Sequence, residues 1–134
     1  MELLQEIFET LKKFDEGLLE GETFVQTYLK MWFKLRDVQY EAIDKMGFSD
    51  ELKALDKRRF LQEIDNETYL QQNDAIIRQI TDLEVPIGSK NDKLLGHLFV
   101  EASEYSEDPE YTDGIGIDEL HQVVKETLSE LEIT

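Results

Sequence analysis

The chain has 134 residues and no cysteine, and 31 acidic against 14 basic residues give it a formal net charge of −17. A chain of this length folds as one domain that buries roughly two thirds of its unfolded surface, and the lack of cysteine excludes disulfides and thiolate metal sites. The negative charge repels nucleic-acid phosphates and anionic membrane surfaces, which argues against direct binding to either.

The composition also indicates a folded, soluble protein. Hydrophobic residues make up 40% of the chain and include five tyrosines and seven phenylalanines, so we expect a packed core rather than a disordered acidic chain. No apolar run approaches the roughly 18 residues of a membrane span, and the first six residues carry acids where a signal peptide has a basic region. We therefore expect an unprocessed cytoplasmic protein.

The first two predicted helices have clear apolar repeats. Residues 3–14 carry apolar side chains at spacings of three and four, which predicts a helix that ends at 15–17. A second helix is expected from near Glu20 toward Met46, with Leu19 stapled onto Phe24. Its predicted apolar face consists of Phe24, Val25, Tyr28, Leu29, Met31, Trp32, Leu35 and Val38.

Two large aromatic residues lie on the inward face of this second helix. The periodicity places Tyr28 and Trp32 in the core. The alternative is that they anchor an interface, since tyrosine and tryptophan are enriched there.

The middle of the chain predicts further helices. Residues 47–49 predict a turn in which Ser49 caps a third helix. Residues 50–85 fit one broken helix or two shorter ones, and we favour two, interrupted at 65–66. The basic cluster at 57–59 is expected to pair with neighbouring carboxylates rather than with phosphate.

The last third predicts two helices. Residues 86–89 form a loop in which Ser89 and Asp92 resemble a capping box, and the 114–116 loop precedes the final helix. The apolar faces are Leu94, Leu95, Leu98, Phe99, Ala102 and Tyr105, and then Leu120, Val123, Val124, Leu128 and Leu131. With no sustained β-alternation, we predict an all-α antiparallel bundle of four to six helices in a single domain, residues 1–134.

The segment 108–114 has the acids and the glycine of a calcium loop, but its register is wrong. With Gly114 at the turn position, Pro109 stands in place of the first ligand and Leu120 in place of the bidentate glutamate. We therefore expect no calcium site.

Other site chemistry is also poorly supported. His97 and His121 are predicted on different helices, where each is expected to be a surface imidazole rather than a zinc ligand. The chain has no serine in a strand-to-helix elbow and no glycine-rich phosphate loop. A carboxylate pair for acid-base catalysis stays open, but it needs a shaped pocket. We expect no metal, no cofactor and no enzymatic activity.

Acidic residues gather between Phe99 and Glu119, where no lysine or arginine occurs. Such a concentration is typical either of a solvated surface that keeps a protein soluble or of a surface that captures a basic partner. We favour the second interpretation. The predicted partner-binding residues are Glu101, Glu104, Glu107, Asp108, Glu110, Asp113 and Asp118.

Several motifs in order resemble the colicin D immunity protein family, small bacterial helical bundles that bind and block a cognate toxic nuclease. The resemblance covers both ends of the chain, while residues 50–85 look like a helical insertion that the family pattern does not require. The motifs are Gly17-Leu18-Leu19, Phe24, Tyr28-Leu29, Trp32, Leu94-Leu95, Leu98-Phe99, Tyr105, Asp108-Pro109 and Ile117-Asp118-Glu119-Leu120.

The resemblance implies an immunity protein that neutralises a tRNA-cleaving toxin, delivered as a bacteriocin or by contact-dependent growth inhibition. Its acids would stand in for the RNA backbone in the toxin's basic cleft, in a one-to-one complex with a protein that is monomeric alone. Ser103 stands where the family pattern has an acid two residues before Tyr105, so the central acid would be Glu101, Glu104 or a loop residue. The alternative function is an acidic helical adaptor that binds a basic region of a non-toxin protein.

Overall fold

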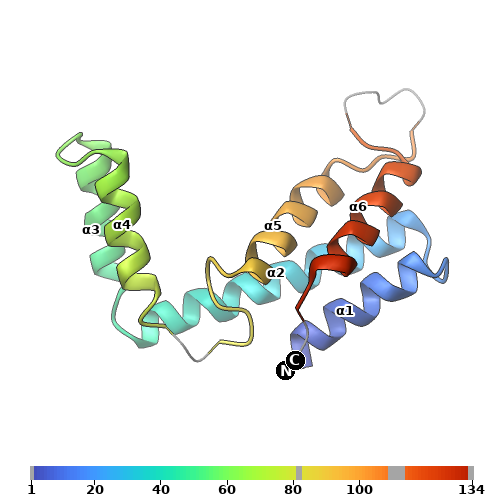
Figure 1. Ribbon diagram of the computed structural model, residues 1–134, viewed down its shortest axis with the longest axis horizontal. Coiled ribbons are helices and arrows are strands. Elements are labelled where there is room, and N and C mark those ends of the chain that lie inside the picture. The colour runs from blue at the N-terminus through green and yellow to red at the C-terminus, as the bar shows by residue number, and fades with distance from the viewer. Residues whose placement is uncertain (1, 81–82, 109–113, 133–134) are drawn as a thin grey trace.

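The structure is a computed structural model that describes residues 2–80, 83–108 and 114–132. Within these ranges it contains six helices and no strand, so the predicted all-α fold is confirmed (Figure 1). The helices are α1 (Glu2–Asp15), α2 (Gly21–Lys45), α3 (Ser49–Phe60), α4 (Asn66–Ile77), α5 (Lys90–Ser103) and α6 (Ile117–Glu130). None of these helices is long and apolar enough to cross a membrane.

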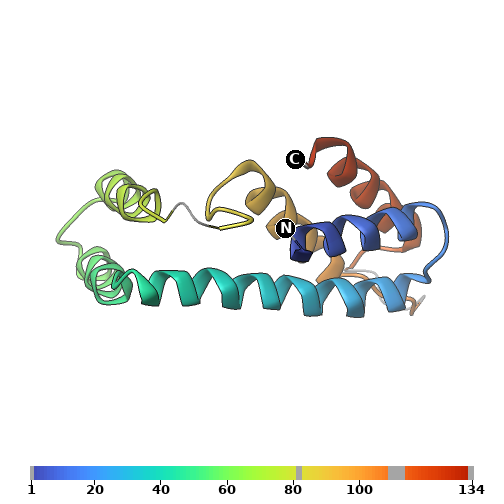
Figure 2. The ribbon, with the colours of Figure 1, turned by 90° about the horizontal axis from the view of Figure 1, so that it is seen from below.

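Four of the helices form a bundle. Helix α1 packs against α2 and α6, and α5 packs against the same two helices, which closes a ring around one core (Figures 1 and 2). The start of α1 and the end of α6 lie at the same end of this bundle (Figure 1). The fully buried core residues include Ile7, Leu11, Phe14, Phe24, Tyr28, Leu95, Leu98, Ala102, Leu120 and Val124.

The first two helices follow their sequence signals. Gly17 has a φ of 79° and ends α1, while the amide of Leu18 donates to the carbonyl of Lys13 at 2.8 Å, as in a glycine-terminated helix. Leu19 packs against the core beside the start of α2, and Phe24 is buried. The predicted boundaries of both helices are therefore confirmed within about one or two residues.

The predicted inward face of α2 is correct as far as Leu35, which is buried in the core. Tyr28 is fully buried and donates its hydroxyl hydrogen to the carbonyl of Leu95 at 2.5 Å, and burial raises the pKa of Tyr28 well above its ordinary value. Trp32 is half-buried at the edge of the core. Val38 is 42% exposed, so its prediction as a core residue is wrong, because the next residue, Gln39, takes the inward position and is buried.

Helices α3 and α4 pack against each other as a hairpin at the far end of α2 (Figure 1). Two helices were predicted here, and Asp65 caps the second by accepting a hydrogen bond from the amide of Thr68 at 2.7 Å. The predicted cap at Ser49 is wrong: Ser49 is the first residue of α3, and its hydroxyl donates to the carboxylate of Asp44. That the hairpin is an insertion relative to a family stays a prediction.

The basic cluster at the end of α3 lies on this hairpin. Arg58 lies 3.8 Å from the carboxylate of Glu63, as predicted, but Arg59 lies over the ring of Tyr69 at 4.9 Å from its centroid. The cluster therefore combines one exposed ion pair with a cation–π contact.

A buried polar cluster ties α2 to the start of α5. Ser89 caps α5 by accepting from the amide of Asp92 at 3.2 Å, as predicted. The Asp92 carboxylate turns inward instead of completing the box, and it accepts from Gln39 at 2.9 Å, from Arg36 at 3.3 Å and from the amide of Gly88 at 2.8 Å. Both Gln39 and Asp92 are buried, so these bonds fix the loop before α5 against α2.

Candidate partner-binding surface

The end of α5 and the start of α6 lie at one end of the bundle, opposite the start of α1 and the end of α6 (Figure 1). The segments between them are tied by backbone hydrogen bonds from Ser106 to the carbonyl of Ile115 at 3.2 Å and from Ile115 to the carbonyl of Glu104 at 3.0 Å. These two backbone bonds join the segment that follows α5 to the segment that precedes α6. Most of the described carboxylates of the acidic segment occur here.

Two of the predicted residues lie at the C-terminal end of α5. Glu101 is half-buried, and its carboxylate lies 3.9 Å from the imidazole of His97. Glu104 is exposed at the C-cap position. Negative charge at a helix C-terminus opposes the helix dipole, typically by about 0.3 to 1 kcal/mol for each charge. These two acids therefore stand where the helix itself would favour lysine or arginine.

Glu107 is held in place by Tyr105. The Tyr105 hydroxyl donates to the Glu107 carboxylate at 3.0 Å. Burial, and then the hydrogen bond and charge of Glu107 and the charge of Glu22, raise the pKa of Tyr105 to about 12. The ring of Tyr105 lies directly on the start of α2, where a Cβ at position 21 would come within 2.5 Å of its hydroxyl oxygen. Gly21 is thus required for this contact.

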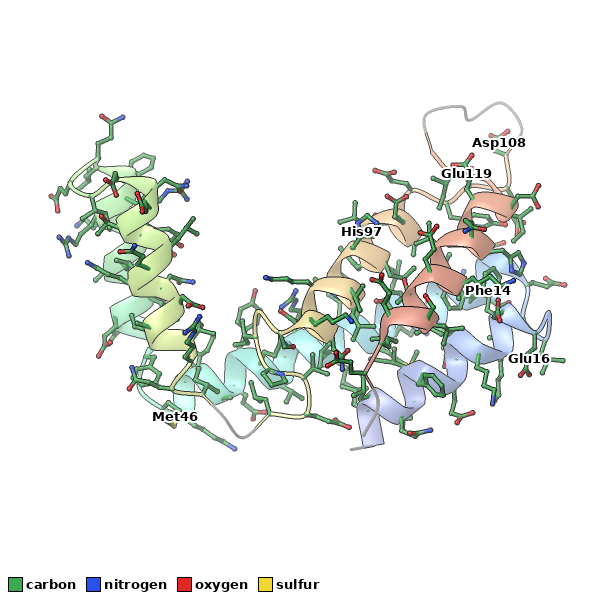
Figure 3. The ribbon with its side chains drawn as sticks, viewed as in Figure 1. Phe14, Glu16, Met46, His97, Asp108 and Glu119 are labelled. Carbon is green, nitrogen blue, oxygen red and sulfur yellow. The ribbon has the colours of Figure 1, made fainter. Side chains whose placement is uncertain are left out.

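The remaining described acids come from the loop and from α6. Asp108 is exposed, and its amide donates to the Ser106 hydroxyl at 3.1 Å. Asp118 and Glu119 are exposed in the first turn of α6, where the helix dipole favours them, and Figure 3 labels Glu119 and Asp108 at this end of the bundle. The predicted site residues Glu110 and Asp113 lie outside the described residues.

Sequence reasoning missed one carboxylate of this surface. Glu22, from the first turn of α2, contributes to the raised pKa of Tyr105 and lies with Glu107 around a surface hollow of about 350 Å³. Glu22 could not be predicted as part of this surface, because it lies some eighty positions before Glu101 and no local sequence pattern marks it. We call the following set the acidic end: Glu22, Glu101, Glu104, Glu107, Asp108, Asp118 and Glu119.

The two histidines differ in their surroundings. His97 is exposed on α5, as predicted. His121 is half-buried, and its ring stacks on Phe14 with centroids 4.1 Å apart and planes at 8°, so the prediction of a simple surface imidazole is wrong for this residue. Among the described residues, no three histidine, aspartate or glutamate side chains come together as metal ligands would.

Searches against protein-family models, curated proteins and solved structures find no match to this chain. The resemblance to the colicin D immunity family therefore stays a prediction that rests on the motifs in the sequence.

Proposed function

We propose that this protein binds a basic nuclease toxin in a one-to-one complex and neutralises it, as an immunity protein does. The acidic end lies against the cleft in which the nuclease holds nucleic acid. The observation that carries this proposal is the convergence on one end of a packed bundle of carboxylates from α2, α5, the following loop and α6, all exposed except the half-buried Glu101.

The chemistry of such a partner fits this surface. A nuclease places lysine, arginine and histidine side chains to hold phosphate groups, and carboxylates accept hydrogen bonds from the same donors. Opposite potentials also steer the two proteins together and raise the association rate, most strongly at low salt.

Two features support a binding role over simple solubility. Glu101 and Glu104 occupy the unfavourable end of the α5 dipole, which costs stability. Glu107 is oriented by Tyr105 rather than left to sample all its rotamers. Orienting side chains before association reduces the entropy cost of binding.

An acidic adaptor that binds a basic region of a non-toxin protein would use the same surface, so the two functions are separated by phenotype. We expect cells that make this protein to survive production of the nuclease encoded by the preceding reading frame, and cells without it to die. If that product is harmless, or if it kills in both cases, the immunity function is wrong.

A charge-reversal variant locates the surface. Changing Glu101, Glu104, Glu107 and Asp108 to lysine should abolish survival, because a carboxylate at the centre of such an interface contributes about 2 to 5 kcal/mol to binding. The control changes the net charge equally by reversing exposed acids on α1 and late in α6, and it should still protect. The control residues are Glu6, Glu9, Glu126 and Glu130.

A further inference from the structure

Aromatic side chains form a cluster on the surface where α2 and α5 meet. The rings of Trp32 and Phe99 stack with centroids 3.8 Å apart and planes at 13°. Phe33 meets both rings edge-on, at 5.4 Å from Trp32 and 5.6 Å from Phe99. Phe33 is 55% exposed, and Val100, the next residue of α5, is 50% exposed. We call Trp32, Phe33, Phe99 and Val100 the aromatic shelf.

Arg36 links the aromatic shelf to the buried polar cluster. The guanidinium of Arg36 lies over the Trp32 ring at 4.7 Å from its centroid. The same side chain donates to Gln39 at 2.7 Å and to Asp92 at 3.3 Å, within the buried polar cluster. Because their contacts already restrain the Trp32 and Phe99 rings, these side chains lose little conformational entropy when a partner covers them, and more of the contact energy is available for binding.

The shelf is continuous with the acidic end. Val100 lies in the last turn of α5 and Glu104, four positions later, is its C-cap residue, so their side chains are neighbours on one helix face, and both are exposed. Interfaces commonly combine an apolar centre that contains aromatic residues with a charged rim. The surface of α5 provides both parts within one helical turn.

We infer that the aromatic shelf is the apolar anchor of the interface with the basic nuclease, and that Phe33 and Val100 cover an apolar patch next to the cationic groups that meet Glu104. This inference rests on the function proposed above. A second copy of this chain is the poorer occupant, because pairing through the shelf would bring together two acidic ends on molecules that each carry a net charge of −17.

The test measures association and dissociation rates with the nuclease domain encoded by the preceding reading frame, made catalytically inactive. Changing Phe33 and Val100 to serine should raise the dissociation rate by at least about tenfold and leave the association rate nearly unchanged, because apolar anchors act on residence time and charges on encounter. Val100→Ser alone leaves the three rings in place and should have a smaller effect in the same direction. The matched control changes Phe60 and Leu70 to serine, since these are at least as exposed as Phe33 and Val100 but lie on the hairpin.

The outcomes separate the two proposals. If the wild-type chain does not bind the nuclease, both fall. If it binds, and reversal of the acidic end abolishes binding while the shelf variants dissociate as slowly as the control, the shelf inference is wrong and the immunity function stands. A wild-type dimer that the Phe33 and Val100 changes convert to monomer would assign the shelf to self-association and likewise overturn the inference.

Discussion

Replacing Asp92 by alanine tests the buried polar cluster that supports both α5 and the shelf. Asp92 is 7% exposed, and its carboxylate accepts hydrogen bonds from Gln39, Arg36 and the amide of Gly88. Its removal leaves the Gly88 amide and one Gln39 donor without this acceptor, although Gln39 keeps its bond to the carbonyl of Val85 at 3.1 Å.

The expected loss of unfolding free energy is about 3 kcal/mol. A buried donor left without a partner costs about 1 to 3 kcal/mol, and breaking a buried ion pair costs about 3 to 5 kcal/mol. The second figure is an upper bound here, because the Arg36 side chain is 25% exposed and water relieves part of its lost pairing.

Urea unfolding followed by circular dichroism measures this loss, and the fluorescence of Trp32, the single tryptophan, reports the same transition next to the cluster. The control is Asp74→Ala, which removes an ion pair with Arg78 at 2.8 Å whose side chains are 55% and 78% exposed. We expect the control to change stability by less than about 0.5 kcal/mol. Equal losses in the two variants would refute the reasoning about burial.

Two further predictions concern the acidic end. Gly21→Ala should destabilise the fold by about 1 to 3 kcal/mol, because its Cβ meets the Tyr105 hydroxyl at 2.5 Å and the Ile117 side chain at 2.8 Å. The control Gly96→Ala lies inside α5 and meets only the Arg36 guanidinium, at 3.6 Å, so it should stabilise the fold by about 0.5 to 1 kcal/mol. Thermal unfolding of both variants measures these changes, and a stabilised Gly21→Ala protein would contradict the contact. Since the pKa of Tyr105 rises from 10.0 to about 12 on folding, the neutral phenol is favoured in the folded state, and the stability present below pH 10 should fall as the pH rises toward 12. Unfolding measured across this range should show a weaker pH dependence in Tyr105→Phe, and identical slopes in the two proteins would argue against it.

The helices could be predicted from the sequence because their signals are local. The repeat of apolar residues at 3–14 and the glycine at position 17 fix α1 without reference to any other segment. Ser89 likewise caps α5 from within four residues. Asp65 marks the break between α3 and α4 for the same reason.

The features that were missed depend on contacts between segments distant in sequence. Asp92 has the spacing of a capping box, but its inward turn follows from the donors of Arg36 and Gln39 on α2. Glu22 joins the acidic end only because α2 begins beside Tyr105. The apolar repeat of α2 likewise continues to Val38, but Gln39 is the buried residue there, because its amide donates to Asp92 and to the carbonyl of Val85.

The central claim, that the acidic end captures a basic nuclease, is tested most directly by the salt dependence of the association rate. Stopped-flow mixing with the inactive nuclease domain should give a rate that falls steeply as salt rises for the wild-type chain and for the control reversed at Glu6, Glu9, Glu126 and Glu130. The variant reversed at Glu101, Glu104, Glu107 and Asp108 should associate slowly at every salt concentration. Association that is independent of salt, or equally affected in the two variants, would contradict the proposal.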